Sequence, residues 1–144
     1  MNQNLSKALY LLKEGNYTCV VCHEDTVHTT CQRGVAPLLC WLDSGADLSG
    51  FSAADRVVGR GAAFLYCLLG VKEVYARVMS HPAAEVLRAH NIHADAELFV
   101  DGIINRAGDG PCPFEAAVMD IRNAEEALTA IRAKRAELRK GANP

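Results

Sequence analysis

Apolar and polar positions along the chain follow two spacings, one typical of helices and one typical of strands. Residues 4–14 carry apolar side chains three and four positions apart, which predicts an amphipathic helix. Asn4 or Ser6 can cap its start, and Gly15 ends it. The first predicted element is therefore a helix of about three turns.

Two β-branched runs follow, over residues 17–23 and 26–31, and they flank a polar pair at 24–25. Such runs around a short polar pair are typical of a β-hairpin. If the polar pair is a two-residue turn, His23 lies opposite Thr26 and every other cross-strand pair is fixed by that register.

The rest of the chain alternates between predicted helices and predicted strands. The longest apolar run, residues 53–69, has helical spacing and ends at Gly70, with Ser52 and Asp55 spaced as in a capping box. This alternation predicts an α/β layer structure. The other predicted elements are a helix over 35–42, a strand over 71–79, a helix over 82–90, a strand or mixed segment over 97–104, a loop over 105–111, a helix that begins near Cys112 and a last helix over about 123–140.

Composition limits the class of protein. The chain has 144 residues, enough for one domain over 1–144, and we expect residues 141–144 to be a disordered tail. Half of the residues are hydrophobic and 22% are charged, which is a globular composition. The net charge of −2 argues against general binding to nucleic acid or to membrane surfaces. No apolar run approaches the ~20 residues of a membrane span, and the N-terminal residues lack signal-peptide features, so we expect a soluble, cytoplasmic protein.

Residues 122–140 hold six Lys and Arg against three Glu, which makes the last predicted helix basic. Its charges are spaced as on a solvated helix face, and we give that interpretation preference over contact with nucleic acid. No membrane or nucleic-acid partner is expected.

Six cysteines in a chain with its own core and no export signal are expected to be reduced thiols. Cys19 and Cys22 with the following His23 spell the C-x-x-C-H pattern of haem attachment. Residues three apart on a strand point to opposite faces, so the two thiols are not expected to share a haem, a metal or a disulfide. Cys19, His23 and His28 do share a face of the hairpin, where either a zinc site or a merely half-exposed surface is consistent with the pattern.

A second group of candidates lies at two predicted helix starts. Cys112 stands between two prolines after a turn-rich loop, and unpaired N–H groups at a helix start stabilise a thiolate. The alternative is that the prolines only begin the helix and Cys112 packs inward. Asp55 and Glu115 suit the first turns of their helices and have the same structural alternative. Gly59 and Gly61 destabilise a helix interior, so they indicate close packing there.

Three blocks of the sequence, residues 55–63, 70–76 and 104–115, resemble an uncharacterised prokaryotic family that carries a domain-of-unknown-function label and has a cytidine-deaminase-like fold. The resemblance covers nearly the whole chain, as far as about Ala130. It implies a three-layer α/β/α sandwich around a mixed β-sheet.

True zinc deaminases place an H-x-E motif at one helix start and P-C-x-x-C at another. Pro111 and Cys112 match the second motif, but Glu115 stands where its second Cys is expected. The first motif is absent, with Asp55 in its place and Val57 at the position of the catalytic Glu. The resemblance therefore implies a family member without the zinc-water reaction, and no metal or cofactor is expected.

Our leading hypothesis is a pocket for a small molecule, which could be nucleotide- or nucleoside-like by analogy with the fold. In this hypothesis Asp55, Cys112 and Glu115 line the reacting end of the pocket. The polar residues expected to hold the ligand are Arg56, Arg60, Asn105 and Arg106.

Two other classes of function stay open at this stage. One is an enzyme with Cys112 as nucleophile and Asp55 or Glu115 as base. The other is an interaction module without chemistry, in which the apolar hairpin and the small-residue helix could support a homodimer.

Overall fold

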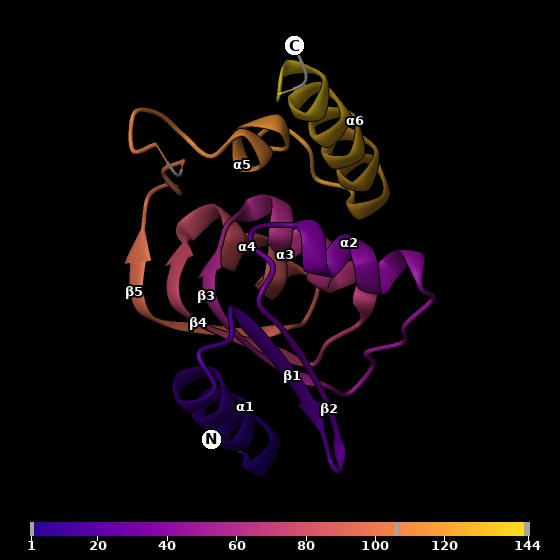
Figure 1. Cartoon of the computed structure of the whole chain (residues 1–144), viewed down its shortest axis with the longest axis vertical. Coiled ribbons are helices and arrows are strands. Elements are labelled where there is room, and N and C mark those ends of the chain that lie inside the picture. Colours follow the sequence, from indigo (N-terminus) through magenta and orange to yellow (C-terminus); the bar gives the residue numbers. More distant parts are fainter. Residues whose placement is uncertain (1, 106, 143–144) are drawn as a thin grey trace.

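The computed structural model describes residues 2–105 and 107–142, and in this part of the chain it shows a five-stranded mixed sheet with helices on both faces (Figure 1). This arrangement confirms the predicted α/β class. The helices are α1 (Gln3–Glu14), α2 (Ala36–Asp43), α3 (Arg60–Leu69), α4 (His81–Ala89), α5 (Pro113–Ala117) and α6 (Ala124–Ala142). The strands are β1 (Cys19–His23), β2 (Thr26–Thr30), β3 (Ser52–Val58), β4 (Glu73–Ser80) and β5 (His93–Val100).

The sheet combines a hairpin with two parallel crossover units. Its strand order is β2-β1-β3-β4-β5, with β1 antiparallel to both neighbours and β3, β4 and β5 parallel to one another. The hairpin register is the predicted one, with His23 opposite Thr26 and Val21 opposite His28. Glu24 makes the tight turn with a φ of 54°, in the left-handed region.

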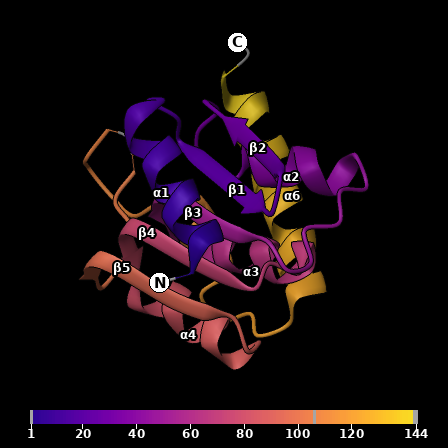
Figure 2. The ribbon, with the colours of Figure 1, turned by 90° about the horizontal axis from the view of Figure 1, so that it is seen from below.

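Alternate residues of each inner strand serve two separate cores. Val20 and Cys22 of β1 pack with Ala54 and with α1, which lies along β1 and β3 (Figure 2). Cys19 and Val21 face the opposite side, where α2, α3 and α4 cover the sheet. The prediction that Cys19 and Cys22 point to opposite faces is therefore confirmed, and all six cysteines are free thiols.

The predicted helix over 53–69 is wrong in its first half. Residues 52–58 form β3, a central strand, and the helix begins only at Arg60. A strand buried on both faces reads as a continuous apolar run, which periodicity cannot distinguish from a buried helix. Gly59 separates the two elements in an extended conformation, and the Ser52 hydroxyl donates to Glu73 instead of capping a helix.

Three predicted boundaries also need correction. Helix α1 is capped by Asn2 rather than by Asn4 or Ser6, since the Asn2 Oδ1 accepts the main-chain N–H of Leu5 at 2.8 Å. Strand β5 covers residues 93–100 rather than 97–104, because Asp101 and Gly102 form the bend that ends it. The last helix continues to residue 142 rather than ending at 140, and residues 143–144 of the expected tail lie outside the described residues.

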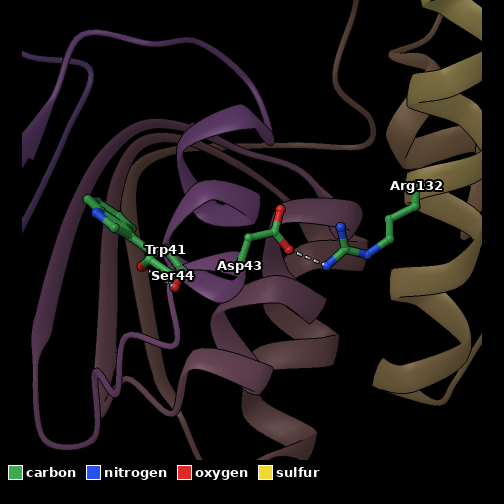
Figure 3. Close-up of polar contacts among 4 residues, drawn as sticks. All are labelled: Trp41, Asp43, Ser44 and Arg132. Carbon is green, nitrogen blue, oxygen red and sulfur yellow. Dashed lines mark hydrogen bonds and ion pairs between the residues drawn. The ribbon is translucent and has the colours of Figure 1, made fainter.

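Helix α6 packs on α3 and α5 and is also joined to α2 by an ion pair. The Arg132 guanidinium lies 2.7 Å from the carboxylate of Asp43, the last residue of α2 (Figure 3). Trp41, on the same helix, points away from this ion pair. The Arg132 bond lowers the pKa of Asp43, but both side chains are exposed and such a pair contributes little to stability. The buried residues Ala127 and Ile131 anchor the helix instead.

None of the helices in the described part of the chain combines the length and the hydropathy that a bilayer crossing requires.

The cap of α1 gives a first testable prediction. Replacement Asn2→Ala removes the cap and one donor to the buried Glu73, so we expect a loss of about 1–2 kcal/mol in the free energy of unfolding. Ser6→Ala is the matched control, because Ser6 is exposed within the helix, and it should change stability by less than about 0.5 kcal/mol. Urea unfolding of both variants measures the difference, and equal losses would contradict the assignment of the cap.

Candidate functional site

A cavity of about 630 Å³ opens at the carboxyl end of β3. Open α/β sheets bind their ligands at this end of the strands. Apolar groups from α2, α3 and the segment before α5 form much of the wall, and polar side chains interrupt them at a few places. The lining residues used below are Cys19, Arg33, Asp55, Arg56, Val57, Ile104, Asn105, Cys112, Glu115 and Leu138.

Asp55 is a carboxylate on the floor of this cavity. It lies on β3 rather than at a helix start, and its Oδ2 accepts the Tyr66 hydroxyl of α3 at 2.6 Å. The Cys19 Sγ lies 3.2 Å from the same Tyr66 hydroxyl oxygen, and Cys19 is opposite Asp55 in the register of β1 and β3. Three segments far apart in the sequence thus place a thiol, a phenol and a carboxylate in one hydrogen-bonded chain.

Burial raises the pKa of Asp55 from 3.8 to about 6. The Tyr66 hydroxyl and the main-chain N–H groups of Arg56 and Val57 stabilise the carboxylate, but they only partly offset the loss of water. Burial likewise raises the pKa of Tyr66 and of Cys19, so both remain protonated donors near neutral pH. Of these three hydrogen-bonded side chains, Asp55 is therefore the one that changes charge near physiological pH.

Glu115 reaches the same cavity but is held by the framework. Its Oε2 accepts the main-chain N–H of Arg60 at 2.7 Å and the Ser80 hydroxyl, while its Oε1 accepts the N–H of Ile103 at 2.6 Å. The N-cap residue of α3 is Gly59, which has no side-chain acceptor, so Glu115 supplies the missing acceptor from a distant helix. Glu115 is only 4% exposed. The hydrogen bonds of its carboxylate join the starts of α3 and α4 to α5.

The glycines predicted to mark close packing are packed against α5. A Cβ on Gly59 would lie 3.2 Å from the Glu115 Oε2, and one on Gly61 would lie 3.2 Å from the main-chain oxygen of Phe114. Both distances are tighter than ordinary contacts. Small residues at the start of α3 therefore allow α5 to approach.

Arg60 belongs to the framework as well. Its guanidinium donates to the main-chain oxygens of Val118 at 3.0 Å and Ile121 at 2.6 Å, and its carbon lies 5.3 Å from the centre of the Phe64 ring. With the residue only 6% exposed, these contacts leave the side chain tied to the segment after α5 rather than directed at a ligand.

The other residues predicted for the site differ in whether they line the cavity and in what they bond. Arg56 and Asn105 line the cavity, with Arg56 donating to Asn16 at 2.9 Å and Asn105 closing its loop on Asp109 at 2.9 Å. Cys112 is partly exposed on the wall and precedes α5, whose five residues give only a weak helix dipole. Arg106 lies outside the described residues.

The sequence analysis missed two features of the cavity. One is the Cys19–Tyr66 pair behind Asp55, because the run that contains Asp55 was assigned to a helix. The other is an apolar rim, defined here as Val57, Ile104 and Leu138, which are 47%, 67% and 43% exposed. Exposed apolar groups beside a cavity are typical of binding sites. Leu138 among the charged residues at positions 134–140 of α6 is the signal that was available in the sequence.

The hairpin face does not assemble a metal-ligand set. Cys19 is directed at Tyr66, while the rings of His23 and His28 lie 5.4 Å and 5.8 Å from the Phe51 ring. Among the residues that the structure describes, no three His, Cys, Asp or Glu side chains lie together in a way that could hold a metal ion.

The fold and the cavity define a class: an α/β domain with a mixed sheet, two parallel crossover units and a ligand-sized cavity at the end of β3. Residues 7–134 match the family model described as TM1506, a domain of unknown function (DUF1893), and the chain belongs to this family.

One similar solved structure is the crystal structure of a DUF1893 family protein (TM1506) from Thermotoga maritima at 2.70 Å resolution. The TM-score is 0.85 at 20% sequence identity, and the match covers 93% of this chain and 92% of that one. At this identity the likeness concerns the fold. No curated protein matches the sequence.

The framework role of Glu115 predicts a large effect on stability. In Glu115→Gln one acceptor oxygen becomes an NH₂ group that faces a donor, so we expect a loss of about 2–3 kcal/mol. Glu126→Gln, at an exposed position of α6, should lie within about 0.5 kcal/mol of the wild type. Urea unfolding compares the two, and a loss below 0.5 kcal/mol in Glu115→Gln would contradict the framework role.

The raised pKa of Asp55 predicts a pH-dependent stability. The folded state binds the proton more tightly than the unfolded state, so this group lowers stability as the pH rises from about 4 to about 7. A shift from 3.8 to about 6 corresponds to at most about 3 kcal/mol. We expect the stability of wild type relative to Asp55→Asn to fall by about 2–3 kcal/mol over this range in urea unfolding.

Asp47→Asn is the control for the sign of this effect. Bonds from Ser49 lower the pKa of Asp47, so its contribution is present above pH 3.8 and is lost only below that value. A wild-type stability that rises between pH 4 and pH 7 relative to Asp55→Asn would contradict the burial of the Asp55 charge.

Proposed function

We propose that this chain is a small-molecule-binding domain whose ligand occupies the cavity beside Asp55. The observation that carries the proposal is the combination of a cavity of about 630 Å³, an apolar rim and a carboxylate whose pKa is raised to about 6. Perturbed titratable groups in a concave, largely apolar site are the usual mark of a functional pocket.

The walls of the cavity favour a ligand of mixed character. Ile104 and Leu138 offer contact to a flat apolar body, whereas Asp55 and Asn105 offer hydrogen bonds and Arg56 offers positive charge. A nucleoside- or nucleotide-like molecule has this distribution of groups. The proposal includes the cytidine-deaminase-like fold, which the mixed sheet between helical layers supports at the level of architecture.

The proposed roles follow from what each side chain has already bonded. Arg60 and Glu115 build the wall through bonds within the chain, so they act on the ligand only through the shape of the cavity. Asp55, Arg56, Asn105 and Cys112 have atoms on the cavity and are the residues proposed to touch the ligand.

A thiol-dependent reaction at Cys112 is the alternative proposal, supported by the position of this partly exposed cysteine on the same wall. It would use the cavity for a substrate rather than for a retained ligand.

The test is a thermal-shift and NMR screen of nucleosides, nucleotides and their free bases. We expect at least one to bind with shifts at Arg56 and Val57. Cys112→Ala should stay folded and bind that compound about tenfold more weakly, which equals about 1.4 kcal/mol of lost contact. Cys40→Ala is the matched control, since Cys40 is exposed on α2 away from the lining residues. Equal stabilisation of wild type and Cys112→Ala by every compound found would refute the assignment of the site.

A further inference from the structure

Among the described residues, Asp55 has a hydrogen-bond donor beside it but no counter-charge. Within the part of the chain that the structure describes, no Lys, Arg or His lies within ion-pair distance of its carboxylate. The hydrogen bond that reaches its carboxylate comes from the neutral hydroxyl of Tyr66, and the neutral thiol of Cys19 lies behind that hydroxyl. A carboxylate removed from bulk water in this way is stabilised most by a cation that enters the same low-dielectric space.

The second carboxylate on the cavity cannot take such a cation. Glu115 already accepts three donors and is almost fully buried, so its oxygens are committed to Arg60, Ile103 and Ser80. Asp55, by contrast, is partly exposed and lines the cavity. A positively charged donor that enters the cavity therefore meets one open carboxylate, at Asp55.

The surroundings also limit the shape of that cation. The lining of the cavity also includes Val57 of the same strand, Ala62 of α3 and Phe114 of α5, which are apolar and favour a flat, weakly hydrated group over a compact ammonium. Two cations, Arg33 and Arg56, lie on the cavity as well, and the guanidinium of Arg56 donates to Asn16. Their positive charge opposes the binding of a cation. A ligand that also carries an anionic group near these two arginines would offset this effect.

We propose that the ligand of this cavity presents a planar, positively charged nitrogen group of the amidinium type to the Asp55 carboxylate. This inference rests on the proposed function, because it names the chemical class of the ligand for the same cavity. Tyr66 is a positioning residue in this scheme, since its hydroxyl holds the Asp55 Oδ2 and leaves the rest of the carboxylate for the ligand. Cys19 holds the Tyr66 hydroxyl from behind.

Binding of such a cation depends on whether Asp55 is ionised. Several other titratable or charged groups lie near Asp55. Cys19 and Tyr66 belong to its hydrogen-bonded chain, Arg33, Cys112 and Glu115 line the same cavity, and Arg56, the next residue of β3, donates to Asn16. With the pKa of Asp55 at about 6, its ionised fraction falls about tenfold between pH 7 and pH 5. The affinity for a permanently protonated amidinium should fall by the same factor.

Benzamidine is the probe, with neutral benzamide and anionic benzoate as matched molecules of the same shape. NMR titrations that follow the amide signals of Arg56 and Val57 measure the dissociation constant at pH 5 and pH 7. We expect benzamidine to bind more tightly than both analogues at pH 7, and to bind about tenfold more weakly at pH 5. Asp55→Asn should bind benzamidine weakly at both pH values.

Tyr66→Phe keeps the inference testable if Asp55→Asn does not fold. Removal of the hydroxyl deletes a bond that lowers the pKa of Asp55, so the midpoint of benzamidine binding should move to higher pH. A purely structural role for Tyr66 would leave that midpoint unchanged. An unchanged midpoint, or a dissociation constant that does not vary with pH in the wild type, would overturn the inference.

The probes also separate this inference from the proposed function. If benzamide, benzoate or a nucleoside shifts the cavity signals and benzamidine binds no better than its analogues, the amidinium class is wrong and the cavity still binds small molecules. If no probe shifts these signals, both proposals fail.

Discussion

The Glu115 carboxylate joins four segments that are far apart in the sequence. It caps the first turn of α3, accepts the hydroxyl of Ser80 that also caps α4, and holds the segment that follows β5. A buried carboxylate is costly unless donors surround it, so each of these segments has to take its place for the others to be stable. The wall of the cavity is a consequence of this arrangement, because α5 reaches α3 only where Gly59 and Gly61 leave room.

A second buried glutamate, on the other face of the sheet, is surrounded by hydrogen-bond donors in the same way. Glu73 accepts the Ser52 hydroxyl and the side-chain amide of Asn2, and Asn2 in turn caps α1. Each of the two glutamates therefore ties a helix start to the sheet through a serine at a strand end. Asp55 differs from both, because one side of it is open to the cavity. Burial makes the charge of Asp55 energetically costly, and its raised pKa reflects that cost.

Local patterns in the sequence predicted the parts of the fold that local physics decides. The hairpin register followed from the polar pair at 24–25, and α2, α4 and α6 were predicted as helices close to their observed ranges. Strand β3 was missed because its first residues are buried on both faces and a helix follows it after a single residue. The bonds of Arg60 and Glu115 could not be predicted, since their partners lie between 12 and 61 residues away and no local signal links them. Asp55 and Cys112 were expected at one pocket for a different reason, two facing helix starts, and they line one cavity although Asp55 lies on a strand.

The division between framework and cavity residues decides what an experiment on this protein can reveal. The likeness to the Thermotoga maritima structure, at 20% sequence identity, concerns the backbone fold. Glu115 and Glu73 are residues that hold this backbone in place. Substitution of such residues changes stability first, and any loss of binding that follows is indirect. Asp55 and Tyr66 are different, because a change of one hydroxyl or one charge there alters how a cavity group titrates. The chemistry of the proposed ligand is therefore tested by the pH dependence of binding to the cavity and not by the architecture around it.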